Sequence, residues 1–151
     1  MKKLFITTLI ISVFLESCAT YPSPKQEISR DGRFIAYNNG IVEDTETGLE
    51  WIAGPDKNTN WNDAQKWVEN LTVAGGGWRM PTRQELKNLY KHGAGERNMT
   101  PLLKTTGWWV WSGETAGSSS AWDFHFRNGG GFWRNRYHSL NDRGFAVRSL
   151  R

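Results

Sequence analysis

The amino-acid sequence predicts a single α+β domain in which two helices pack on short, mostly antiparallel strands. Three observations support this class. Apolar residues recur at helical spacing in residues 60–71 and again in residues 82–92. Short apolar runs bounded by Asn-, Gly- and Ser-rich turns come before the first helix and after the second. Alternation of apolar and polar residues over 122–127 is typical of a strand with one buried face.

The first residues resemble a bacterial lipoprotein signal. A short positive start precedes an apolar run over residues 4–15, which is too short to cross a bilayer. The only cysteine, Cys18, follows this run, where a lipidated cysteine would become the new N-terminus. Glu16 stands where such signals usually have a small residue, so an ordinary cleaved signal is the alternative. We expect a signal peptide at 1–17 and lipidation at Cys18.

Residues 18–32 are expected to form a flexible tether, because they contain prolines and serines and few apolar side chains. This leaves residues 33–151 as one domain, long enough for a single core. One cysteine permits no internal disulfide, so apolar burial has to stabilise the fold. The formal net charge of +4 is mild and does not indicate a nucleic-acid partner.

The domain is predicted to open with short antiparallel strands. RFIAY (33–37) and GIVED (40–44) are joined through an Asn-Asn-Gly turn, where Asn and Gly tolerate positive φ. A second turn, TETG, leads to a third strand at 49–52. Thr59 or Asn60 can then cap the first helix. The apolar face of that helix is formed by Ala64, Trp67, Val68 and Leu71.

The stretch GGGWRMPTRQEL (75–86) raises the question of a ligand-binding loop. A phosphate loop needs Gly-Lys-Ser/Thr after its glycines, and a dinucleotide fingerprint needs G-x-G-x-x-G between a strand and a helix. Neither is present. Thr82 and Glu85 fit a capping box, and Pro81 keeps the preceding residue out of the helix. We therefore interpret the stretch as the start of the second helix, expected to end at Gly93. Its buried stripe is Leu86, Leu89 and Tyr90.

The last third of the chain is predicted to be rich in strands. A buried strand is expected at 108–112 and a polar loop at 113–120. In the following strand, Trp122, Phe124 and Phe126 are expected to be buried and the residues between them exposed. The remaining segments are an extended stretch at 132–140, a turn at 141–144 and a last strand at 145–151.

Six stretches occur in an order that resembles one bacterial family: GIVEDTETGLEW, WNDAQKWVENL, GGGWRMPTRQEL, WVWSGE, AWDFHFRNG and FAVRSLR. The family is named after the C-terminal domain of a collagen-like surface adhesin, Lcl. The resemblance covers roughly residues 38–151 and is most specific in WRMPTRQEL and in the stretches from AWDFHF to VRSLR. Its structural signature here is Trp78, Arg79, Pro81, Thr82, Glu85, Leu86, Trp111, Trp122, Phe126 and Arg148.

This resemblance implies a C-type-lectin-like fold, which is similar also to the formylglycine-generating and sulfatase-modifying group. Formylglycine-generating enzymes use two cysteines, which this chain lacks. Calcium-dependent lectins of the broad fold use Trp-Asn-Asp together with Glu-Pro-Asn or Gln-Pro-Asp. Residues 61–63 read Trp-Asn-Asp but open a helix, and the other triplets are absent. The resemblance therefore implies neither that enzyme activity nor a calcium site.

Other catalytic patterns are equally weak. The three histidines have no metal-binding spacing, and Ser118 to Ser120 lack a G-x-S-x-G motif. Glycoside cleavage would require Glu114 and Asp123 to converge. We predict no metal, no cofactor and no catalytic residue. Three arginines are instead interpreted as structural, with Glu85 or Asp44 as partners: Arg79, Arg148 and Arg151.

A binding surface over residues 123–141 is the strongest candidate site. Arg, Trp and Tyr are frequent at the energetic centres of interfaces, and Asn and His supply adaptable hydrogen bonds. The planar guanidinium group also suits carboxylate or sulfate groups of acidic glycans. A solvated loop with salt-bridged arginines is the alternative. The candidate ligand-binding residues are Asp123, His125, Arg127, Trp133, Arg134, Asn135, Arg136, Tyr137, His138 and Asn141.

The sequence thus predicts a cell-envelope lipoprotein whose domain binds a glycan or a protein without catalysis. Ala19, rather than Asp, after the cysteine indicates the outer membrane by resemblance to bacterial sorting signals. One alternative is a structural subunit of an envelope complex, which would self-associate through its tryptophans. The other is an enzyme that acts on envelope polymers through Glu114 and Asp123.

Overall fold

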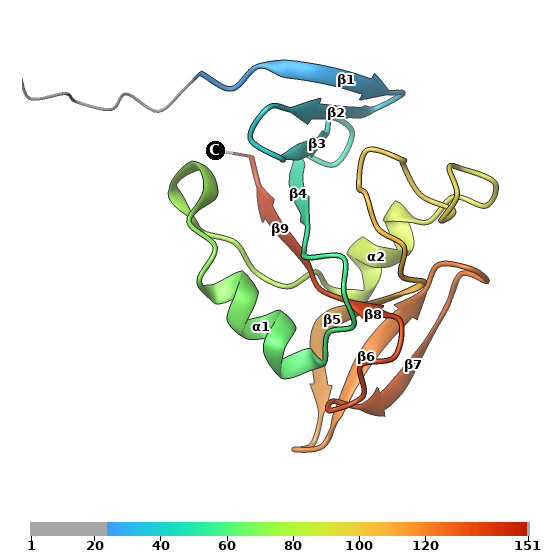
Figure 1. The fold of residues 1–151 in the computed structure, drawn as a ribbon. Helices are drawn as coiled ribbons and strands as arrows, with labels where there is room; N and C mark the ends of the chain where they lie inside the picture. The colour runs from blue at the N-terminus through green and yellow to red at the C-terminus, as the bar shows by residue number, and fades with distance from the viewer. Residues whose placement is uncertain (1–23, 151) are drawn as a thin grey trace, which may run out of the picture.

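Two sheets and two helices make up residues 24–150, the part of the chain that this computed structural model describes (Figure 1). One sheet has the strand order β1-β2-β3-β4-β9 and the other β7-β6-β5-β8. All pairings are antiparallel except that of β5 with β8, which is parallel. The predicted α+β class is confirmed. The predicted signal peptide, Cys18 and Arg151 lie outside the described residues, and no described helix has the length and apolar character to cross a bilayer.

The first sheet contains the predicted hairpin and one further strand, at residues 27–31, that the sequence does not predict. The composition predicts a tether over 18–32, yet residues 27–31 pair with β2 as an edge strand. Every residue of this strand is exposed, so backbone hydrogen bonds rather than apolar burial hold it, and no apolar pattern marks it. The strands are β1 (Glu27–Asp31), β2 (Phe34–Tyr37), β3 (Val42–Asp44), β4 (Leu49–Ala53) and β9 (Phe145–Ser149).

The second sheet extends into the stretch predicted as a polar loop at 113–120. After a register shift beyond Trp111, the exposed end of β5 still pairs with β6, so only residues 117–119 connect the two strands. The predicted burial of Trp122, Phe124 and Phe126 is confirmed, but the predicted exposure of Asp123 is wrong, because residues 121–124 are all buried. Ala121 packs in one core cluster and Trp122 in another, so both faces of β6 are covered. The strands are β5 (Trp109–Ala116), β6 (Ser120–His125), β7 (Gly130–Asn135) and β8 (Asp142–Arg143).

Both helices begin as their sequences predict. In α1 (Trp61–Glu69), the Asn60 side chain accepts a hydrogen bond from the amide of Asp63 at 2.9 Å. In α2 (Arg83–Leu89), the Thr82 side chain accepts from the Glu85 amide, and the Glu85 carboxylate accepts from the Thr82 amide, which completes the capping box. Helix α2 ends at Leu89 rather than at Gly93, because Tyr90 is already extended and packs against Phe124.

The core consists of two apolar clusters with β9 between them. Phe145 and Val147 belong to the first cluster and Ala146 to the second, as alternation along a strand requires. Both clusters lie between Phe34 and Val147, so a chain that begins at Pro24 keeps the whole described core. Several residues of the family resemblance fill these clusters; the buried ones are Trp78, Leu86, Trp111, Trp122 and Phe126.

The glycine-rich stretch wraps around Arg148. Gly75, Gly76 and Gly77 all have positive φ, which glycine adopts without strain. This course directs the carbonyl oxygens of Ala74 and Gly76 toward the Arg148 guanidinium, which donates to them at 3.0 and 2.6 Å. The stretch therefore has the structural role that the sequence predicts.

The structural interpretation of Arg79 and Arg148 holds, with one change of partner. Arg79 pairs with Glu85 at 2.6 Å, as expected. Arg148 pairs with Glu50 at 2.7 Å and lies over the Trp78 ring. Asp44, the other expected partner, pairs with Arg33 instead.

Gly131 of β7 leaves room for the indole ring of Trp122 on the neighbouring strand β6. A Cβ atom on Gly131 would lie 1.8 Å from Cζ2 of Trp122, inside the indole ring. We expect Gly131→Ala to lower the free energy of unfolding by about 1–3 kcal/mol, because Trp122 has to leave its buried position. Urea denaturation of the chain from Pro24 onward measures this. The matched control is Gly130→Ala, whose Cβ would meet its nearest neighbour at an ordinary 3.4 Å. Equal effects of the two substitutions would contradict the prediction.

Candidate ligand-binding site

Exposed apolar side chains gather on β7 and the segment that follows it. Among the described residues, six large apolar side chains are exposed, and four of these lie within residues 132–140. Strand β7 is an outer strand of its sheet, so it presents side chains on both faces and an unpaired edge. The four side chains, named here the aromatic surface, are Phe132 (51% exposed), Trp133 (47%), Tyr137 (68%) and Leu140 (66%).

Two buried carboxylates lie on the face of the second sheet that carries Phe132, opposite to the face that carries Trp133. Asp123 is at the centre of β6, opposite Phe132 of β7, and Asp142 begins β8, opposite Trp109 of β5. Both are fully buried. The sequence predicts Asp123 on the solvated face of its strand, but both faces of β6 are covered, so this carboxylate cannot meet a ligand at the surface. The Oδ1 atom of Asp123 has no hydrogen-bond partner among the described residues.

Arg134 and His138 cover the buried acids. The Nη1 atom of Arg134 donates to Asp123 Oδ2 at 3.0 Å and to Asp142 Oδ1 at 3.4 Å. The Nδ1 atom of His138 lies 2.8 Å from Asp142 Oδ2, and the Arg134 guanidinium contacts the His138 ring. These contacts hold the segment after β7 against the sheet. We name the four residues the acid cluster: Asp123, Arg134, His138 and Asp142.

An aromatic ring extends the acid cluster toward His125. The Arg134 guanidinium lies 4.5 Å from the centroid of the Trp109 ring, within the range of a cation–π interaction. Trp109 also stacks on His125, with centroids 3.9 Å apart and rings nearly parallel at 8°, and it meets Phe132 edge to face. His125, Arg134 and Phe132 are thereby linked through one indole.

Burial determines the protonation of the acid cluster. It raises the pKa of Asp123 to about 7; the Arg134 guanidinium acts against this shift, and the Asp142 carboxylate adds to it. Burial also raises the pKa of Asp142, against the effect of its contacts with His138 and Arg134. Burial therefore favours the neutral form of the Asp123 carboxyl up to near-neutral pH. Perturbed acids of this kind mark candidate functional sites.

The remaining predicted residues divide into supports and exposed groups. Arg136 turns toward α1, where it donates to Asn62 Oδ1 at 2.5 Å and lies over the Trp61 ring, so it fastens the segment to the helix. Asn135 uses its side chain to accept from the Tyr137 amide. Three of the predicted residues are exposed and contact no charged partner among the described residues: Arg127, Tyr137 and Asn141.

The sequence did not identify Trp109, Phe132, Leu140 or Asp142 as part of this region. Trp109 reads as one residue of a buried strand, and Asp142 reads as part of a turn. Only the parallel pairing of β8 with β5, which joins residues far apart in the chain, brings these two together. Phe132 stands next to Trp133, and two adjacent apolar residues in a strand predict burial of both faces, so the sequence pattern favours burial rather than the observed exposure.

Glu114 and Asp123, the two acids that the enzymatic alternative requires to converge, are each paired with a different arginine. Glu114 pairs with Arg83 at 2.7 Å and accepts from its amide, which caps the start of α2. Asp123 pairs with Arg134 as described. Within residues 24–150, no group of three or more His, Cys, Asp or Glu side chains is placed to hold a metal ion.

The fold and the surface define a small α+β domain that presents exposed aromatic side chains over a buried, charged cluster. The family model for the Lcl C-terminal domain matches residues 40–151, and the chain belongs to this family. This confirms the resemblance drawn from the six sequence stretches. The family is that of a collagen-like adhesin domain and is not a known enzyme family. Comparison with curated proteins gives no match. The C-type-lectin-like fold that the resemblance implies stays a prediction.

The raised pKa of Asp123 predicts a pH-dependent stability. An acid whose folded-state pKa lies above its unfolded value stabilises the fold at low pH, and this contribution is lost as the pH rises through the folded pKa. For Asp123 the loss extends from about pH 4 to about pH 7. We therefore expect the free energy of unfolding of the native chain to fall between about pH 4 and pH 7, relative to that of Asp123→Asn, which cannot ionise.

The comparison with Asp123→Asn is needed because His125 acts in the opposite direction. Burial lowers the pKa of His125, so its contribution grows as the pH rises through this range. Urea denaturation of both chains at several pH values gives the difference. A difference that stays constant from about pH 4 to pH 7 would show that Asp123 is ionised throughout.

Proposed function

We propose that this domain is a non-catalytic binding module that recognises a glycan or a protein through the aromatic surface. The observation that carries the proposal is the concentration of exposed Phe132, Trp133, Tyr137 and Leu140 on one edge of the second sheet. Several large apolar side chains exposed within one short segment indicate a surface that meets a partner. The family's adhesin-like character supports the same function.

The acid cluster supports this proposal by making the surface rigid. Arg134 and His138 hold the segment after β7 through contacts with buried carboxylates, and Arg136 fastens it to α1. A segment that is ordered before binding loses less conformational entropy when a ligand arrives. The arginines thus act mainly as supports, and stacking on aromatic rings supplies the affinity, in place of the direct arginine contacts that the sequence suggests.

The anchoring of the domain is also part of the proposal. A lipid on Cys18 would attach the chain to a membrane, with the outer membrane of the cell envelope as the expected location. The support for this is the sequence of residues 1–19, with its positive start, apolar run and single cysteine. Labelling of cells with a fatty-acid probe, with Cys18→Ala as control, tests the lipid separately from the binding surface.

The same aromatic surface favours one rival function, a structural subunit that self-associates. Strand β7 has an unpaired edge, and such edges can pair with a second chain. Sedimentation of the chain from Pro24 onward distinguishes the two functions. A concentration-dependent dimer that dissociates on substitution of Trp133 would favour the structural subunit, and a monomer that binds a ligand favours the binding module.

We expect Trp133→Ala combined with Tyr137→Ala to weaken ligand binding more than tenfold, because central aromatic residues of an interface contribute about 2 kcal/mol or more each. The measurement is binding of the soluble chain to an array of acidic and neutral glycans, with calcium and with a chelator, and to envelope proteins by cross-linking. Ile28→Ala is the matched control, since Ile28 is 64% exposed on the other sheet. Equal binding by the double variant and the native chain would refute the assignment of this surface.

A further inference from the structure

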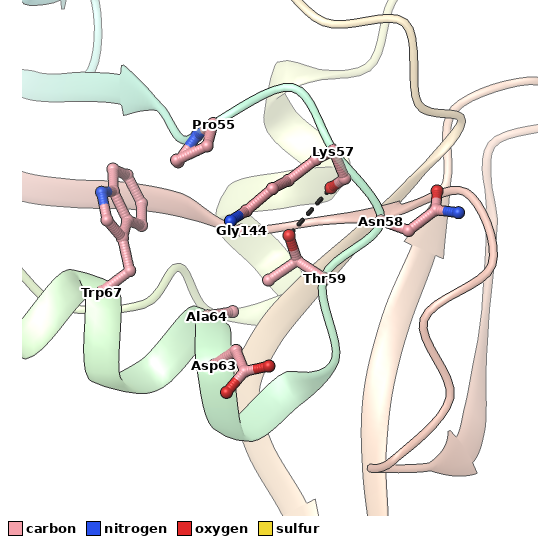
Figure 2. A pocket seen from close by; sticks show the side chains of 8 residues that line it. All are labelled: Pro55, Lys57, Asn58, Thr59, Asp63, Ala64, Trp67 and Gly144. Atoms are coloured by element: carbon pink, nitrogen blue, oxygen red, sulfur yellow. Dashed lines mark hydrogen bonds between the residues drawn. The ribbon is translucent and has the colours of Figure 1, made fainter.

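A hollow separate from the aromatic surface lies beside helix α1. It is a hollow of about 270 Å³ formed by α1, the loop from β4 to α1, and the backbone at Gly144. Figure 2 shows Trp67 at one end, Lys57 extending across the opening toward it, and Asp63 on the first turn of α1. No residue of the aromatic surface lines this hollow, so it is a separate site.

Trp67 forms one wall of the hollow, and its ring packs against two glycines. A Cβ atom on Gly54 would lie 3.1 Å from Cζ3 of Trp67, and a Cβ on Gly144 would lie 3.6 Å from Cε3. The indole therefore packs directly on the backbone of both segments, which are themselves joined by the hydrogen bond from the Gly54 amide to the Gly144 carbonyl at 2.9 Å. The indole remains only partly buried. It is a rigid flat wall for a ring to stack on.

The polar groups around this wall have unused hydrogen-bonding capacity. Within the described part of the chain, neither the Lys57 ammonium nor the Trp67 indole N–H makes a hydrogen bond or ion pair, although most arginines are paired. Asn58 uses its oxygen to accept from the Asn141 amide, while its NH₂ group donates to no described residue. Asp63 accepts one hydrogen bond, from the Asn60 side chain to Oδ2.

These features select one kind of ligand. The positive charge of Lys57 and the negative charge of Asp63 balance, so the hollow has no net preference for an anion or a cation. Lys57 and Asn58 supply donors and Asp63 supplies acceptors beside the Trp67 indole, which suits a ring with an apolar face and a rim of hydroxyl groups. The volume lies below the roughly 300–1,000 Å³ of pockets for drug-sized ligands, which limits the ligand to a single small ring.

We propose that this hollow binds one neutral sugar ring, with its apolar face on Trp67 and its hydroxyl groups on Lys57 and Asp63. The site goes beyond the proposed function, because it lies on different elements from the aromatic surface. It gives the domain a monosaccharide site that is independent of the extended ligand.

The test is ¹H–¹⁵N correlation spectroscopy of the chain from Pro24 onward, titrated separately with D-glucose, D-galactose, D-mannose and N-acetyl-D-glucosamine. We expect at least one sugar to shift the amides of residues 57–59 and the Trp67 indole N–H saturably. Loss of one indole signal in Trp67→Phe assigns that resonance. Lys57→Met and Asp63→Ala should each weaken the binding about tenfold or more, since hydrogen bonds to charged groups contribute about 1.5–3 kcal/mol.

Two matched variants make the outcome specific. Lys66→Met removes another exposed lysine, on α1 but outside the hollow, and Trp133→Ala alters the aromatic surface. Both should bind the sugar as the native chain does. Absence of saturable shifts with all four sugars in a folded chain would overturn the proposal. So would equal weakening by Lys66→Met, shifts confined to residues 132–140, or binding of the zwitterion L-leucine at these amides in preference to every sugar.

Discussion

The run from Asp142 to Arg148 belongs to both sheets, and the rest of the structure depends on it. Residues 142–143 pair with β5 in one sheet, and residues 145–149 pair with β4 in the other. Every side chain from 142 to 148 is buried. Because the run is covered on both faces, each apolar cluster needs it, and its two charged ends, Asp142 and Arg148, can be buried only with partners on other elements.

The partners of Arg148 and Asp142 explain the positions of the glycine-rich stretch and of the acid cluster. At one end, Arg148 is neutralised by Glu50 and held by carbonyl oxygens of the glycine-rich stretch, so the three glycines supply backbone conformation to an ion pair. At the other end, Asp142 shares Arg134 with Asp123 and also contacts His138. The first end is fully compensated and structural. At the second end, burial raises the pKa of Asp123 to about 7, and Arg134 and His138 hold the segment after β7 against the buried carboxylates.

The features that the sequence predicted well are those with local causes. The capping box of α2 depends on residues three positions apart, and the hairpin from β2 to β3 depends on a turn, so both can be read without knowledge of the rest of the chain. Strand β1 could not be predicted, because its exposed residues contribute backbone hydrogen bonds and no apolar pattern. The alternation in β6 predicted an exposed Asp123, but both faces of this strand are covered. Asp123 is buried because Arg134 of the neighbouring strand pairs with it. Arg134 and Arg136 were recognised as important, but their direction, inward rather than outward, depends on contacts with Asp142 and Asn62 that only the fold creates.

Strand β1 is the outer strand of one sheet and β7 the outer strand of the other, and they lie at opposite ends of the molecule (Figure 1). The chain therefore enters β1 at the end of the domain opposite to β7. A partner that binds along β7 would lie away from this point of entry, so the two do not compete for the same part of the domain surface.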